Sequence, residues 1–118
     1  MSTLSDVEVE QLRDIRSRLN RVAKGQLGDK SVGPLSKGFF DVCGRVGLTP
    51  DPIATPPSLE AVKDADIGAL RRQISGLQAL KASDPAAYRK LFEAGVLQAI
   101  ATRRLVLGGK ERSSEELT

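Results

Sequence analysis

The sequence predicts an all-α protein of three or four amphipathic helices, joined by an extended connector rich in glycine and proline. Apolar residues recur at three- and four-residue steps in the first and last parts of the chain, as on one face of a helix. Between these parts, residues 25–57 hold six glycines and five of the six prolines, which interrupt regular structure. Such an arrangement allows a chain that is non-globular outside an assembly.

The first segment, residues 1–25, is an expected N-terminal amphipathic helix over residues 6–24. Ser5 and Glu8 have the spacing of a capping box, in which each side chain accepts a hydrogen bond from the backbone amide of the other residue. Gly25 is the expected stop. The apolar stripe of this helix consists of Leu12, Ile15, Leu19 and Val22.

The second segment, residues 26–57, is the connector with one short helix over residues 35–46. Pro34 suits the first turn of that helix, and the glycines within it weaken it by roughly 1 kcal/mol each relative to alanine. The prolines from Pro50 to Pro57 stiffen the rest of the connector. A polyproline ligand for an aromatic groove is the alternative, but Asp and Thr interrupt the run, so we favour a plain spacer.

The third segment, residues 58–109, is expected to be helical. Ser58 can cap a short turn that reaches Val62, and Asp66 can cap a helix over residues 67–82.

A further helix over residues 85–104 is indicated by Asp84 and Pro85, because aspartate favours the N-cap and proline the first helical position. Gly95 either ends this helix or is tolerated within it. Residues 110–118 are an expected polar tail.

The composition argues against catalysis and metal binding. There is no histidine, which is the usual general base near neutral pH, and the single cysteine, Cys43, cannot form a cysteine-only metal site. We therefore predict a protein that is not an enzyme and has no cofactor, catalytic residue or metal ligand. Cys43 lies in an apolar run and is expected to be a buried, inert thiol. Residues 25–31 look superficially like a phosphate-binding loop, but their spacing is wrong.

The net charge of +3 allows nucleic acid as a partner without requiring it. Most charges are interleaved, as where Asp14 precedes Arg18 by four residues. Two tandem pairs have fewer acidic neighbours, and they are the candidate phosphate contacts: Arg71, Arg72, Arg103 and Arg104. A solvated or protein-facing role for these arginines is the favoured interpretation, by about two to one.

The function that this pattern favours is a structural or adaptor subunit of a larger assembly, such as a virion, which acts by helix-mediated packing. Its partner would be another protein or a second copy, and the stripe Leu12, Ile15, Leu19 and Val22 is the expected contact face. A small basic nucleic-acid-binding protein is the alternative. No small-molecule substrate is expected. The polar start and the absence of a long apolar run predict a protein in the cytoplasm or an intracellular assembly, neither secreted nor membrane-spanning.

Overall fold

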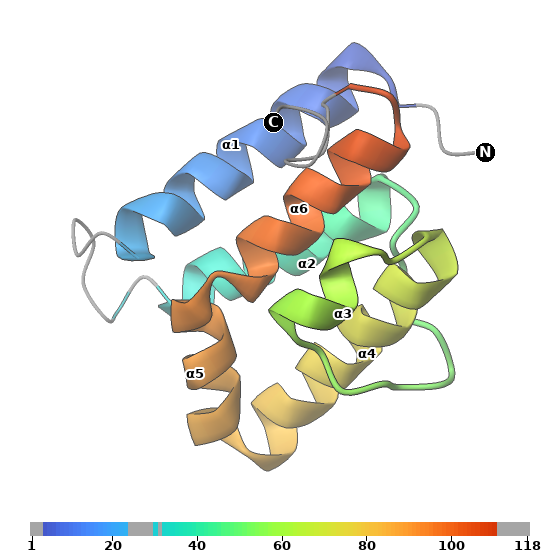
Figure 1. The fold of residues 1–118 in the computed structure, drawn as a ribbon. Helices are drawn as coiled ribbons and strands as arrows, with labels where there is room; N and C mark the ends of the chain where they lie inside the picture. Colours follow the sequence, from blue (N-terminus) through green and yellow to red (C-terminus); the bar gives the residue numbers. More distant parts are fainter. Residues whose placement is uncertain (1–3, 24–29, 31, 111–118) are drawn as a thin grey trace.

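Helices account for nearly all of the regular structure in the computed structural model, which describes residues 4–23, 30 and 32–110. In this part of the chain there are six helices and no strand (Figure 1). They are α1 (Asp6–Ala23), α2 (Val32–Arg45), α3 (Leu59–Lys63), α4 (Ile67–Ser83), α5 (Pro85–Ala94) and α6 (Val96–Leu107). The all-α prediction is therefore confirmed.

The chain packs into a compact body. Its radius of gyration is 13.3 Å and its extents are 33 × 33 × 28 Å. A radius of about 13 Å is what a compact domain of this length has. A chain that is non-globular outside an assembly does not fit these dimensions.

The predicted start signals are confirmed at four helices. The Ser5 amide donates to Glu8 Oε1 at 2.9 Å, and the Glu8 amide donates to Ser5 Oγ at 3.2 Å, which completes the capping box of α1. Ser58, Asp66 and Asp84 accept from backbone amides at the starts of α3, α4 and α5, at 3.0, 2.7 and 3.1 Å. The expected stop at Gly25 lies outside the described residues.

Two helix boundaries differ from the sequence-based expectation. α2 begins at Val32 instead of residue 35, and Pro34 lies in its first turn, as predicted. The helix expected over residues 85–104 is two helices, because Gly95 adopts φ +89° and its amide donates to the carbonyls of Leu91 and Phe92. This left-handed conformation ends α5 and turns the chain into α6.

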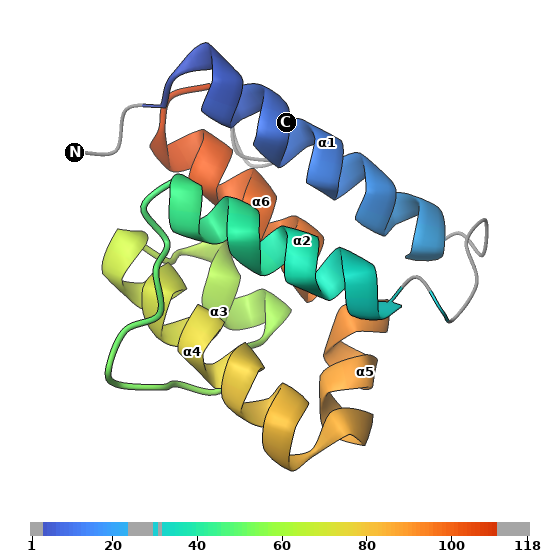
Figure 2. The same ribbon diagram turned by 180° about the vertical axis from the view of Figure 1, so that it is seen from behind.

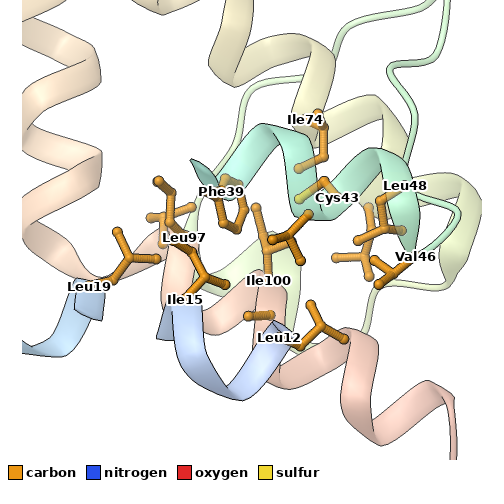
Figure 3. Packing of buried hydrophobic residues seen from close by; sticks show 14 of the residues in the cluster. Leu12, Ile15, Leu19, Phe39, Cys43, Val46, Leu48, Ile74, Leu97 and Ile100 are labelled. Carbon is orange, nitrogen blue, oxygen red and sulfur yellow. The ribbon is translucent and has the colours of Figure 1, made fainter. Parts of the chain in front are cut away.

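α6 lies at the centre of the fold. α1 and α2 pack on one side of it and α3 and α4 lie on the other, while α5 closes one end (Figures 1 and 2). Apolar residues occur all around α6, as expected of a helix that is buried on most of its surface. Its fully buried side chains include Leu97, Ile100 and Leu105. In Figure 3, side chains from α1 and α2 gather around Leu97 and Ile100.

Candidate interaction surface

The apolar stripe of α1 belongs to the core of the chain. Leu12, Ile15 and Leu19 are buried, and Val22 is partly buried against the same cluster. Figure 3 shows Leu12, Ile15 and Leu19 directed toward α6 and Phe39 of α2. The sequence correctly placed these four residues on one face, but that face covers α2 and α6 and is not available on the surface.

Three of the four candidate phosphate-binding arginines hold backbone carbonyls of the chain itself. Arg71 Nε donates to the carbonyl of Thr49 at 3.0 Å, Arg103 Nε to that of Ala65 at 2.7 Å, and Arg104 Nε to that of Val46 at 2.8 Å. Two of the acceptors, Val46 and Ala65, lie within two residues of the ends of α2 and α3, and Thr49 lies in the connector that follows α2.

The fourth, Arg72, is half-buried, and its Nη1 lies beside Gly68. Arg104 is only 3% exposed. Burial lowers the pKa of its guanidinium, and the nearby charge of Glu8 partly opposes that effect. These surroundings favour a structural role for the tandem arginines.

Arginines of α1 also contribute to packing. Arg16 Nη1 donates to Thr102 Oγ1 of α6 at 3.1 Å, and Arg13 Nη2 donates to the carbonyl of Lys110 at 3.3 Å. Arg18 pairs with Asp14 at 3.2 Å on the exposed face, as the spacing predicted. Of the four tandem arginines, Arg71, Arg103 and Arg104 thus donate to acceptors within the protein.

Tyr88 and Cys43 are buried side chains that can ionise. The hydroxyl of Tyr88 donates to Ser36 Oγ at 2.6 Å between α5 and α2. Cys43 is buried, and desolvation raises the pKa of its thiol far above the ordinary value of 9.0. No three His, Cys, Asp or Glu residues within the described ranges 4–23, 30 and 32–110 could hold a metal ion together.

The proline-rich connector is bound along α4, whereas the sequence suggested a plain spacer. Besides the Arg71–Thr49 bond, Ser75 Oγ donates to the carbonyl of Asp51 at 2.6 Å, and the amide of Thr55 donates to the carbonyl of Arg72 at 3.1 Å. Figures 1 and 2 show this segment passing along α4 before α3.

Gly76 makes this close approach possible. A Cβ atom at that position would overlap the carbonyl of Thr55 and lie 3.1 Å from Pro57 Cδ. The hydrogen bonds and the close contact together fix both ends of the segment from Thr49 to Pro57.

The middle of the connector presents an isoleucine to solvent. The side chain of Ile53 is 65% exposed, and its amide donates to Asp51 Oδ1 at 2.9 Å, which fixes the turn. The neighbouring residues Pro52 and Ala54 are exposed as well. Together these three residues give the anchored loop a small exposed apolar surface.

A hollow of about 410 Å³ opens between α2 and α4. Phe40 of α2 and three residues of α4, Gln78, Lys81 and Ala82, line it. Phe40 is half-buried, and the Nζ atom of Lys81 lies 6.0 Å from the centre of its ring. The ring therefore offers apolar surface beside a positive charge. The sequence placed Phe40 in an apolar run, which gave no sign that its ring reaches the surface.

Comparisons with protein families, with curated proteins and with solved structures found no match. None of the helices in the described part of the chain has the length and apolar character that a membrane-crossing segment needs.

Proposed function

We propose that the protein is a non-enzymatic subunit or adaptor of a larger assembly, such as a virion, and that it acts by binding another protein chain. The contact surface is the connector between α2 and α3, centred on Ile53, and not the stripe of α1. This kind of function is the one that the sequence favours, but the contact residues lie in the connector and not on α1.

The observation that carries this proposal is the exposed Ile53 on an anchored loop. Hydrogen bonds from Arg71 and Ser75 fix the connector on α4. A loop that is already ordered loses little conformational entropy on binding, so less of the free energy gained by burying its apolar side chain is spent on ordering the loop. Burying one isoleucine side chain contributes roughly 1.5–3 kcal/mol.

The test is gel filtration of extracts from the cells that produce the protein or the particles that contain it. It compares the unmodified chain with two variants, Ile53→Asp and Val7→Asp. We expect the unmodified chain to elute in gel filtration well above its own 12.6 kDa. Ile53→Asp should release it as the free chain, because an aspartate cannot enter an apolar contact. Val7→Asp is the matched control, since Val7 is 64% exposed at the start of α1. Elution of the unmodified protein as the free chain would contradict the proposal.

Nucleic-acid binding ranks below protein binding, because three of its four candidate arginines use Nε for carbonyls of the chain. Phosphate contacts would require these side chains to serve two roles at once. No observation in the described part of the structure favours this second function independently.

A further inference from the structure

We infer that the hollow between α2 and α4 receives the connector of a second copy of this chain, so that copies associate head to tail. This inference rests on the proposed function and names the partner. The two contact surfaces are the connector tip, Pro52 to Ala54 with Asp51, and the hollow lined by Phe40, Gln78, Lys81 and Ala82.

The apolar parts of the two surfaces match. The hollow of about 410 Å³ has the half-buried ring of Phe40 in its wall. The connector tip carries an isoleucine that is largely exposed. Packing Ile53 against Phe40 would remove both apolar groups from water, which is the main favourable contribution to association.

The charges match as well. Lys81 stands beside Phe40 in the hollow, and the carboxylate of Asp51 lies two residues before Ile53 in the connector. When Ile53 enters the hollow, the Asp51 carboxylate approaches the Lys81 ammonium. Opposite charges placed in this way fix the orientation of the contact.

The hollow also continues a surface that already binds this connector within one chain. Arg71 and Ser75 of α4 hold the connector, and Gln78 and Ala82 come after them at the spacing that keeps residues on one helix face. The first half of this face is covered by the connector of the same chain, and the second half is open.

The connector tip of a chain does not reach the hollow between α2 and α4 of the same chain. Its connector is fixed over the first half of α4, and Ile53 remains exposed in that position. Because the two surfaces differ, the contact between copies is heterologous, and each added copy leaves one connector and one hollow open. Such contacts produce rings or open chains of copies.

The experiment measures the mass of the purified full chain by sedimentation equilibrium over a wide concentration range. We expect a mass that rises above 12.6 kDa with concentration. Ile53→Asp and Lys81→Glu should each raise the dissociation constant, Ile53→Asp by about ten- to a hundredfold, the loss expected for one buried isoleucine. Val7→Asp and Lys90→Glu are matched exposed controls, and they should associate like the unmodified chain.

Mixing the two weakened variants tests the head-to-tail geometry directly. The Ile53→Asp chain keeps an intact hollow, and the Lys81→Glu chain keeps an intact connector. At a concentration between the dissociation constants of the unmodified chain and of the variants, an equimolar mixture should therefore form a dimer of one chain each and stop there. Each variant alone should stay at the mass of one chain at that concentration. Circular dichroism shows that each variant remains helical.

A purified chain that stays at 12.6 kDa at every concentration would overturn the second-copy contact. The same holds if Ile53→Asp associates as the unmodified chain does, or if the mixture forms no dimer. If the purified chain is a single copy while the native assembly still depends on Ile53, the partner is a different protein and the proposed function stands. If the native assembly does not depend on Ile53 either, both fail.

Discussion

Arg104 is buried between helices, and the carbonyl of Val46 accepts a hydrogen bond from its Nε atom. Val46 lies just after the last turn of α2, and Gly47 takes φ +83° so that the amide of Leu48 can reach the carbonyl of Cys43 at 2.7 Å. The guanidinium stays protonated in proteins and carries five donors, so it can satisfy a helix-end carbonyl and keep other contacts. Arg71 and Arg103 likewise donate from Nε to a backbone carbonyl, that of Thr49 and that of Ala65.

Two buried acids, Cys43 and Tyr88, predict a loss of stability at alkaline pH. Burial raises the pKa of both groups from ordinary values of 9.0 and 10.0, so the folded chain keeps each proton where the unfolded chain releases it. The unfolded state then binds fewer protons than the folded state, so the free energy of unfolding falls as pH rises. The fall begins above pH 9.0 for Cys43 and above pH 10.0 for Tyr88. Each group contributes about 1.4 kcal/mol per pH unit while it remains protonated in the folded chain.

Urea unfolding between about pH 8 and about pH 11 measures this effect. The unmodified chain should lose stability from about pH 9, and more steeply above about pH 10 where Tyr88 adds its contribution. Cys43→Ala should lower stability at about pH 8, and its decline with pH should be shallower in the lower part of the range. Equal slopes for the two proteins would contradict the assignment to Cys43.

At the scale of elements, the sequence was most informative where the signal is local. Ser5, Ser58, Asp66 and Asp84 each bond an amide three residues away, so short sequence patterns identify them. Gly95 was ambiguous, because whether a glycine ends a helix depends on the packing of the residues after it.

The binding of the connector to α4 could not be predicted from local patterns. Arg71 lies 22 residues from Thr49, and Ser75 lies 24 residues from Asp51. Nothing in the intervening sequence signals these pairs. For the same reason the sequence singled out Arg71, Arg103 and Arg104 but not the carbonyls that accept from them. It also gave no sign that Ile53 is exposed on an anchored segment.

Gly76→Ala tests whether close packing of the connector on α4 stabilises the fold. The added methyl group would overlap the Thr55 carbonyl, so the connector must shift, at a cost of about 1–3 kcal/mol. Gly44→Ala is the control, because Gly44 lies within α2 with open space around it, and there alanine should stabilise by about 1 kcal/mol. Thermal unfolding should move the two variants in opposite directions. A neutral Gly76→Ala would show that the connector is not packed closely.

At the scale of the whole molecule, the stripe of α1 stabilises the fold of one chain. Leu19 is 1% exposed, and replacing it by aspartate removes apolar contacts and places a charge in the core. Loss of a buried leucine side chain costs about 2–5 kcal/mol, and the whole stability of a domain is about 5–15 kcal/mol. Leu19→Asp should therefore abolish the helical circular-dichroism signal.

Asn20→Asp provides the comparison, because Asn20 is the exposed neighbour of Leu19 on α1 and the change adds the same charge. It should leave the spectrum unchanged. A Leu19→Asp chain that stays helical but loses association would instead show that the stripe is a contact between chains, as the sequence alone suggested.

The packing of α1 on α6 also has a consequence for synthesis. The side chain of Arg16 donates to that of Thr102, 86 residues later in the chain. The apolar face of α1 thus packs on α6, which is the last helix of the described chain to be synthesised. During translation Leu12, Ile15 and Leu19 have no α6 to cover them, and contacts between distant segments form slowly. A nascent chain interrupted before α6 would expose this stripe, and it would depend on chaperones to avoid aggregation.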